Sequence, residues 1–419
     1  MVSAMRDSAA RWTNWQGNQT FVPSSFFIPH SELDVAQIVA GARASGSAVR
    51  VSGSGHSNTP IVQTDGVLLD LSQLSGIIRT DVATGTAVIK GGTRISHIGE
   101  SMWEAGLSLD NQGDTDSQTI GGATATGTKG SGTSLTNMSA TVCGLRLVTG
   151  TGELAVIDES DRDLLSAAQV SLGLMGVVTE MTIKVAPAYN LQESLTVSTL
   201  PEVLELWDDE PDRHRHFSLL WAPSGGSSNL YGLPTLQADE SLVKILRPSP
   251  VVTGAPQTLP LTGMAGNRDG RAYLVYPDIP DDGVSDLLEL EYMVDRRDSR
   301  AAFLALRSLM QESFPDEMSP VQVRWQKADE AFLSAQYRRD TVSLSVSSKP
   351  DRRTFLPAVD ECLRQWDVRP HWGKQHFSTP DQIRQSFPML DSFLTIRKSF
   401  DPEGVFLNDY FKYLFGIET

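Results

Sequence analysis

The sequence has very few cysteines. Only Cys143 and Cys362 occur among 419 residues, and they lie far apart in the chain. Two such residues cannot form a disulfide framework or a cysteine-based metal site, so we expect buried thiols and a reducing compartment. His214 and His216 are spaced to lie on one face of a strand, but no third ligand is close to them in the sequence. The sequence therefore predicts no metal site.

Positive charge and long apolar runs are also scarce. The chain has 35 Lys and Arg against 51 Asp and Glu, which gives a formal net charge of −16. This surplus repels nucleic acids and anionic membrane surfaces, so the expected partner is a neutral or cationic small molecule. No uncharged apolar stretch reaches the length of a transmembrane helix, and residues 1–11 lack the segments of a signal peptide. We expect a soluble, cytoplasmic protein.

The length and the residue patterns predict an α+β protein with two domains or a large cap. A chain of 419 residues exceeds what one hydrophobic core usually serves. Residues 31–45 have the apolar spacing of a short helix with Ser31 as its N-cap. Strands are expected at residues 48–51 and in a hairpin over 77–90. Composition changes at Ala186–Pro187, where we place a domain boundary.

Two segments are rich in glycine and small polar residues. The first, Ser52–Ser57 (SGSGHS), directly follows a predicted strand. Its backbone N–H groups can hold a phosphate, although the loop lacks the Lys of a P-loop and the spacing of a dinucleotide fingerprint. A tight turn with a surface histidine is the alternative. The second, residues 110–132, nearly lacks bulky apolar side chains, so we expect it to lie outside the packed core and to approach a ligand closely.

Five motifs follow one another along nearly the whole chain. They are TNWQGN at residues 13–18, RVSGSGHS at 50–57, GDTDSQTIGGA at 113–123, RPHWGK at 369–374 and DPEGVFLN at 401–408. On these motifs the sequence resembles the FAD-linked oxidoreductases of the vanillyl-alcohol oxidase type, and within them the sugar-alcohol and aldonolactone oxidases. The resemblance implies an α+β fold whose parts are a two-part FAD-binding domain (1–187), an α+β cap domain for the substrate (188–370), and a C-terminal segment that returns to the FAD-binding domain (371–419).

The resemblance also implies where FAD binds. In covalent members the histidine of the GSGHS loop is bonded to the flavin 8α-methyl group, and that residue is His56 here; noncovalent FAD is the alternative. Such a bond fixes the ring and makes the flavin a stronger oxidant. Val178 is expected near the adenine. Where the family usually reads GTHG this chain has Lys129, which either pairs with the diphosphate or faces solvent. The other cofactor-binding residues implied by the resemblance are Ser52, Gly53, Ser54, Gly55, Ser57, Gly113, Thr115, Asp116, Thr119, Gly122, Ala123, Thr126, Gly127, Thr128 and Asn408.

Five residues are implied around the substrate. In polyol oxidases a Glu-x-Arg pair on one cap strand, a hydroxyl residue on the next and the Lys of HWGK converge on the alcohol. Here they correspond to Gln322, Arg324, Ser347 and Lys374. Because Gln322 cannot accept a proton or neutralise the two cations, we expect Arg324 to lower the pKa of Lys374, which then acts as a neutral base. Asp114 receives or orients the substrate hydroxyl; a structural role as a loop cap is the alternative.

The predicted function is that of an FAD-dependent oxidase for a hydroxyl group on a polyol or sugar-like substrate. Hydride passes to flavin N5, and O2 takes up the electrons to give H2O2. Gly113 favours oxygen as the acceptor, because in the family a side chain at this point hinders oxygen. The alternatives are an aldonolactone dehydrogenase with another acceptor, a tailoring oxidase of a glycoside or nucleoside alcohol, and a flavin-binding protein that lost its chemistry through Gln322.

Overall fold

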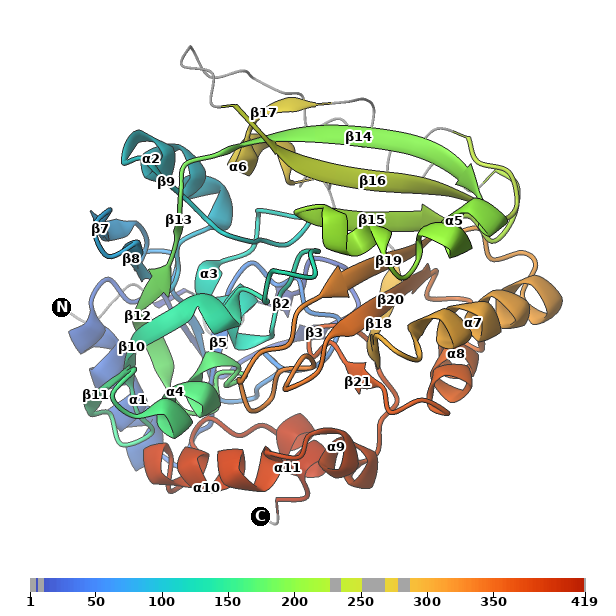
Figure 1. The fold of residues 1–419 in the computed structure, drawn as a ribbon. Helices are drawn as coiled ribbons and strands as arrows, with labels where there is room; N and C mark the ends of the chain where they lie inside the picture. Colours follow the sequence, from blue (N-terminus) through green and yellow to red (C-terminus); the bar gives the residue numbers. More distant parts are fainter. Residues whose placement is uncertain (1–4, 7–10, 227–234, 251–267, 278–286, 418–419) are drawn as a thin grey trace.

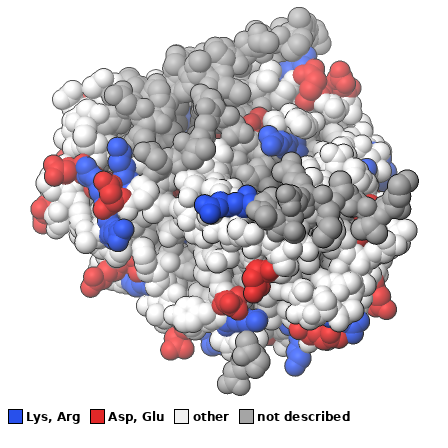
Figure 2. All heavy atoms as spheres, turned by 180° about the vertical axis from the view of Figure 1, so that it is seen from behind, with Lys and Arg blue, Asp and Glu red and all other residues white. Residues whose placement is uncertain are grey.

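The computed structural model describes residues 5–6, 11–226, 235–250, 268–277 and 287–417. Figure 1 shows a large sheet with its helices at the top and right, smaller sheets at the left, and three C-terminal helices along the bottom. None of the helices in these ranges is long and apolar enough to cross a membrane. On the described part of the face in Figure 2, acidic and basic side chains are interspersed and form no broad basic patch.

The first sheet is mostly parallel and leads into the loop at residues 52–57. Helix α1 (Glu32–Ala44) begins at the predicted N-cap, Ser31, whose hydroxyl accepts from the N–H of Asp34 while the Asp34 carboxylate accepts from the N–H of Ser31. The buried face of α1 packs in a core that includes Phe406 of the C-terminal segment. In spatial order the strands are β1 (Met5–Arg6), β4 (Ser25–Phe27), β6 (Val67–Asp70) and β5 (Val49–Ser52).

The second sheet is antiparallel and contains the predicted hairpin over residues 77–90. Helix α4 (Arg162–Gln169) packs beside it and begins at Asp161, whose carboxylate accepts from the N–H of Leu164. In spatial order the strands are β11 (Leu154–Asp158), β10 (Val142–Val148), β12 (Val177–Lys184), β8 (Thr86–Lys90) and β7 (Ile77–Asp81). Shorter elements nearby are β2 (Trp12–Thr13), β3 (Thr20–Phe21), β9 (Leu107–Ser108), β13 (Ala186–Pro187), α2 (Gly99–Glu104) and α3 (Ile120–Ala125).

Two expectations about burial are wrong. The segment 110–132 is largely buried and contains α3, whose Ile120 and Ala123 belong to a hydrophobic core. Its glycines and small residues allow close packing inside the molecule, which no local pattern in the sequence indicates. Cys143 and Cys362 are unbridged thiols, but both are half-buried rather than fully buried.

The third sheet forms most of the cap. Its strands in spatial order are β17 (Asp269–Arg271), β14 (Asn190–Thr199), β16 (Glu240–Ser249), β15 (His216–Trp221), β19 (Val321–Gln326), β20 (Thr341–Ser348), β18 (Leu288–Asp295) and β21 (Arg369–Pro370). One face packs in an apolar core with α5 (Leu200–Leu206), α7 (Ser299–Ser313) and α8 (Phe355–Leu363). The helix α6 (Ala272–Val275) follows β17.

The opposite face of the cap sheet is polar. Side chains alternate along a strand, so Val321, Val323 and Trp325 enter the apolar core while Gln322 and Arg324 point to the other face. In the register of the sheet, Gln322 pairs with Ser345 and Arg324 pairs with Ser343 of β20. On the far side of β20, Glu289 and Glu291 of β18 pair with Ser347 and Ser345. Charged and hydroxyl side chains therefore line this face of the sheet.

The C-terminal segment packs against the first and second sheets. It contains α9 (Pro380–Ser386), α10 (Leu390–Phe400) and α11 (Asp409–Phe415). Phe387, Phe393 and Phe411 are fully buried in a core shared with the second sheet. We therefore propose the division at residues 1–187, 188–370 and 371–419.

Candidate active site

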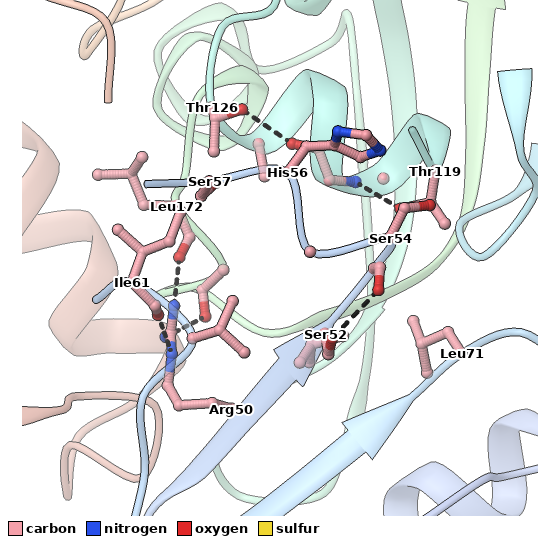
Figure 3. A pocket seen from close by; sticks show the side chains of 18 of the residues that line it. Arg50, Ser52, Ser54, His56, Ser57, Ile61, Leu71, Thr119, Thr126 and Leu172 are labelled. Carbon is pink, nitrogen blue, oxygen red and sulfur yellow. Dashed lines mark hydrogen bonds between the residues drawn. The ribbon is translucent and has the colours of Figure 1, made fainter. Parts of the chain in front are cut away.

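A cavity of about 1150 Å3 lies along the loop that follows β5. Figure 3 shows Arg50 at the lower left, where it donates hydrogen bonds to the carbonyls of Ile61 and Leu172, and His56 higher up. The wall consists mainly of glycine, serine, threonine and small apolar residues. The predicted cofactor-binding residues that line this cavity are Ser52, Gly53, Ser54, Gly55, His56, Ser57, Thr119, Gly122, Ala123, Thr126 and Val178.

The SGSGHS loop is in close contact with the N-cap of α3. A Cβ atom added to Gly53 would lie 2.3 Å from Thr119 Oγ1, which no real side chain tolerates. The Ser54 hydroxyl donates to the carbonyl of Ser117 at 2.6 Å, which fixes the loop to the 113–123 motif. Glycines and small residues of the two motifs meet here in the cavity wall, which suits close approach of a large cofactor.

Arg50 is one of the residues that line this cavity. Its guanidinium donates to the carbonyl oxygens of Ile61, Leu172 and Phe406 at 2.8, 2.9 and 2.7 Å. Burial lowers its pKa to about 10, with Asp401 opposing that shift, so it stays charged at neutral pH. Arg50 therefore ties together three chain segments that line or support the cavity, a role that its place in the RVSGSGHS motif did not reveal.

His56 is held in the cavity wall by two neighbours. Its ring stacks on Trp15 with a centroid distance of 5.0 Å, and its Nε2 lies 2.8 Å from the hydroxyl of Ser117. The half-buried ring lines the cavity rather than lying on the surface of a tight turn. Its orientation is thus set by contacts from the 13–18 and 113–123 motifs.

Six predicted cofactor residues are outside the wall of this cavity: Gly113, Thr115, Asp116, Gly127, Thr128 and Asn408. A Cβ on Gly113 would lie 2.8 Å from the methyl group of Thr128, so that glycine is packed against its neighbour. Asn408 supports the cavity from behind, because its side-chain amide donates to the carbonyls of Pro60 and Gln63 at 2.9 Å each. The cofactor contacts of these six residues stay predictions.

Several residues that line the cavity were not predicted from the sequence. They include Trp12, Gln19, residues 59–63, Gly91, Gly92, Gln118, Ser171, Leu172 and Gly173. The glycine-rich stretch after Leu172 was a signal that could have indicated Ser171, Leu172 and Gly173. Gln118 is informative, because its buried Oε1 has no hydrogen-bond partner among the described residues. An N–H or O–H donor on a ligand would satisfy this atom.

Asp114 brings together three of the predicted substrate residues. Its Oδ2 accepts hydrogen bonds from Gln322 Nε2 and from Arg324 Nη1, both at 2.8 Å. Asp114 comes from the loop of the FAD-binding part, and the other two come from β19 of the cap sheet. Asp114 of the FAD-binding part therefore supplies the carboxylate that Gln322 lacks.

Glu291 forms the other half of this cluster. Its Oε1 accepts from Arg324 Nη2 at 2.7 Å and also pairs with Lys129 Nζ. Lys129 is 2% exposed and donates to Ser343 Oγ at 3.1 Å, so both expectations for Lys129, a diphosphate contact and a solvent-facing position, are wrong. Glu291 was not predicted; acidic residues alternating with leucine in β18 (LELEYMVD) were the available signal.

The charges in this cluster shift one another's pKa. Burial raises the pKa of Glu291, but Lys129 and Arg324 outweigh that effect and hold it well below its ordinary value. Burial lowers the pKa of Lys129 to about 8, Arg324 adds to the shift, and Glu291 opposes it. Arg324 remains charged, since Asp114 and Glu291 raise its pKa beyond the effect of burial.

Lys374 forms an ion pair with Glu289 of β18 beside this cluster. Burial lowers the pKa of Lys374 to about 8, and Asp114 opposes that shift. The expected direction is therefore correct, but the expected cause is wrong, since Arg324 is neutralised by Asp114 and Glu291. Ser347 lies opposite Glu289 in the sheet and is buried. The polar face thus carries both a carboxylate cluster and a lysine with a pKa near neutrality.

Comparisons with known proteins identify the family to which the chain belongs. A family described as FAD binding domain matches residues 23–158, and one described as D-arabinono-1,4-lactone oxidase matches residues 284–414. The L-gulono-1,4-lactone dehydrogenase of Mycobacterium tuberculosis is 33% identical in an alignment that covers 97% of this chain and 99% of that protein. The alditol oxidase of a Streptomyces species is 28% identical over 96% of this chain and 98% of its own length. The L-gulonolactone oxidase of Bos taurus is 26% identical over 97% of this chain and 98% of its own.

The solved structure of cholesterol oxidase from B. sterolicum has the same fold. Its TM-score is 0.81 with 16% identity, and the match covers 98% of this chain and 97% of that one. The chain therefore belongs to the vanillyl-alcohol oxidase type of FAD-linked oxidoreductases, in the group of aldonolactone and sugar-alcohol enzymes. It is an FAD-dependent enzyme that acts on CH–OH groups. The cavity fits that cofactor, because its wall consists mainly of glycine, serine, threonine and small apolar residues and because Gln118, which lines it, has a buried acceptor without a partner among the described residues.

Proposed function

We propose that the protein is an oxidase of a hydroxyl group on an aldonolactone or polyol, with O2 as electron acceptor and H2O2 as product. The observation that carries this proposal is the cluster in which Asp114 meets Gln322 and Arg324 between the cap and the FAD-binding part. Such a cluster presents both hydrogen-bond donors and a carboxylate to a hydroxylated molecule. The names of the most similar relatives, which act on aldonolactones or alditols, support the same substrate class.

The residues around the substrate have distinct roles in this proposal. Lys374 in its neutral form accepts the hydroxyl proton at Nζ, since a base with a pKa near 8 is suited to proton transfer at neutral pH. Asp114 orients the hydroxyl, while Arg324 and Gln322 fix the carboxylate through Oδ2. Ser347 donates or accepts a further hydrogen bond from the polar face. When bound, FAD accepts the hydride that leaves the carbinol carbon.

We also infer that FAD is attached covalently through His56. The support is the position of the ring in the cavity wall and its fixed orientation between Trp15 and Ser117. A bond to the protein prevents loss of the cofactor and raises its oxidising power. A cytoplasmic location is proposed as well, and the two unbridged thiols support it.

The choice of electron acceptor has one specific alternative. The relative with 33% identity is named a dehydrogenase, whereas the alditol and gulonolactone relatives are named oxidases. We favour the oxidase because Gly113 offers no side chain to hinder oxygen. In a dehydrogenase, an added dye rather than O2 would reoxidise the enzyme rapidly.

The test is steady-state turnover of the purified holoenzyme with L-gulono-1,4-lactone, D-arabinono-1,4-lactone, xylitol and sorbitol. Oxygen uptake and H2O2 release are recorded in one series, and reduction of a dye under anaerobic conditions in another. We expect oxygen uptake matched by H2O2 with at least one substrate. Dye reduction with negligible oxygen uptake would favour the dehydrogenase, and no turnover in either series would reject the proposal.

A further inference from the structure

A second, smaller cavity lies beside the catalytic cluster. Asp114 and Arg324 form part of its wall. The other lining residues are Ser131 and Tyr276, together with His216 and Ser218 of β15 and Lys244 and Leu246 of β16. The space between them holds about one water-sized group, which is the size of a hydroxyl.

His216, one of the residues that line this cavity, has a buried ring nitrogen without a hydrogen-bond partner in the described part of the chain. The residue is 2% exposed, and its Nδ1 lies 2.8 Å from the carbonyl oxygen of Ser131. A carbonyl only accepts, so Nδ1 carries the ring proton and Nε2 is left as an acceptor. Nε2 is buried and has no hydrogen-bond partner among the described residues. Burial lowers the pKa of His216 to about 3, with Arg215 adding to the shift, so the ring stays neutral at physiological pH.

The other walls of the cavity supply donors. Ser218 has a hydroxyl group, and Lys244 has an ammonium group that lies 3.3 Å from Glu193 Oε1. The Tyr276 hydroxyl oxygen accepts from the N–H of Ser131 at 3.0 Å, and burial raises its pKa, so the phenol keeps its proton. The ring of Tyr276 packs edge-on against His216 with a centroid distance of 4.7 Å. These contacts hold both rings in place.

The donors and acceptors identify the chemistry of a ligand. The two cations in the wall are already paired with carboxylates, Lys244 with Glu193 and Arg324 with Asp114. The cavity therefore has no unbalanced positive charge for an anion. A group that satisfies Nε2 of His216 must donate a hydrogen bond, which a carboxylate or a phosphate dianion cannot do. A hydroxyl group donates and accepts, and it matches both sides of the cavity.

We propose that this cavity is a subsite for a second hydroxyl group of the substrate, on a carbon other than the one that is oxidised. The inference rests on the proposed function, because Asp114 and Arg324 are shared between the cavity and the catalytic cluster. His216 accepts from the substrate hydroxyl, and Ser218 and Lys244 donate to it. The subsite selects neutral polyhydroxylated substrates over aldonic or uronic acids of the same length.

The variant that tests the subsite is His216→Asn. The Asn amide can replace the Nδ1–H donor to Ser131, but it has no acceptor at the place of Nε2. The matched control is His214→Asn, since His214 lies two positions away and contacts Glu210 at 2.7 Å, outside this cavity. Kinetic constants are measured for the best substrate of the panel, for its monodeoxy analogues, and for the corresponding aldonic acid.

We expect His216→Asn to lower kcat/KM for the parent substrate by roughly ten- to a hundredfold, mainly through KM. The monodeoxy analogue that lacks the hydroxyl bound in the subsite should already have a low kcat/KM with the original enzyme. Its kcat/KM should change less than threefold in His216→Asn. His214→Asn should leave all these ratios unchanged. An equal loss for the parent and every analogue would overturn the proposal, because it would show a merely structural role for His216. No loss at all would also overturn it, since the cavity would then hold only water.

A binding measurement separates this inference from the proposed function. The chain has 7 histidines, so the 15N signals of a histidine-labelled holoenzyme are few, and the variant identifies that of His216. Titration with the non-oxidised polyol or lactone should shift the Nε2 signal of His216. A shift without any turnover would retain the subsite and reject the proposed oxidase. Turnover without a shift would retain the oxidase and reject the subsite.

Discussion

Asp114 Oδ2 and Arg324 Nη1 form an ion pair at 2.8 Å. Asp114 lies in the loop of the FAD-binding part, and Arg324 lies on β19, a central strand of the cap sheet. Both side chains are nearly buried, with 13% and 8% exposure. A contact of this kind is strong because little water screens it. Residues of the FAD-binding loop and of the cap sheet therefore both contribute to the proposed substrate site.

Replacement of Asp114 by Asn should strongly slow turnover. Asn keeps the shape but loses the charge that holds Arg324 Nη1 and Gln322 Nε2. We expect kcat/KM to fall by about 10²- to 10³-fold, as for the loss of a positioned charged group in an active site. Asp110→Asn is the matched control, since Asp110 pairs with Arg215 near the surface in the same segment. Equal effects of the two variants would exclude a specific role of Asp114.

The rate of flavin reduction should depend on pH through Lys374. The neutral amine exists above its pKa of about 8, so the rate should rise with pH through that value and then level off. Glu289→Gln should move the midpoint to lower pH, because the ion pair with Glu289 favours the charged form of Lys374. The measurement is stopped-flow reduction of the enzyme-bound flavin from pH 6 to 10.

Two further variants test whether Lys374 is the source of this pH dependence. Lys374→Met should abolish the step together with most of the rate. Lys129→Met should preserve the step, although the pKa of Lys129 is also about 8, because Lys129 is bound to Glu291 and Ser343. If the pH step disappears in Lys129→Met but survives in Lys374→Met, the titrating group is Lys129, and the proposed role of Lys374 is wrong.

The effects of replacing Lys129 and Glu291 on the free energy of unfolding should be strongly coupled, because the two side chains form a buried ion pair. Glu291→Gln leaves Lys129 and Arg324 with one carboxylate fewer, and breaking a buried ion pair typically costs about 3–5 kcal/mol. Lys129→Met should cost less, since Glu291 still has Arg324. The double variant should be more stable than the sum of the single effects by at least about 1 kcal/mol. Urea unfolding of all four proteins gives these values, and simple additivity would contradict the pairing.

The proposed covalent bond between FAD and His56 predicts a simple result on denaturation. Acid precipitation should leave the yellow colour in the protein pellet, and the denatured gel band should fluoresce. His56→Ala should bind FAD that is released into the supernatant. Ser117→Ala removes the hydroxyl next to Nε2 and should slow attachment without preventing it. Yellow supernatant from the unaltered protein would show that His56 only lines the cavity.

The sequence was most informative where a local pattern determines structure. The helix with its Ser31 cap and the hairpin over residues 77–90 depend on neighbours in the chain, and both form as predicted. The resemblance also led to Asp114, Gln322 and Arg324, which the fold brings into contact. Their catalytic roles stay predictions.

Long-range register explains what the sequence could not predict. Glu291 reaches Arg324 only because β18 and β19 flank β20 in the cap sheet, and no local pattern encodes that order. Lys129 is buried by the same assembly, in a segment whose small residues suggested an open loop. His216 Nδ1 likewise binds the carbonyl of Ser131, 85 residues earlier in the chain, and this contact leaves Nε2 without a partner among the described residues.

The most direct test of the account is to mix the oxidised holoenzyme with L-gulono-1,4-lactone or xylitol without oxygen and to follow the flavin absorbance near 450 nm, before and after oxygenated buffer is added. We predict that the band bleaches with at least one of them, and that oxygen restores it rapidly with release of H2O2. Failure of every tested lactone and polyol to bleach the band would contradict the assignment of the substrate class. Bleaching followed by slow recovery in oxygen would contradict the assignment of O2 as the acceptor.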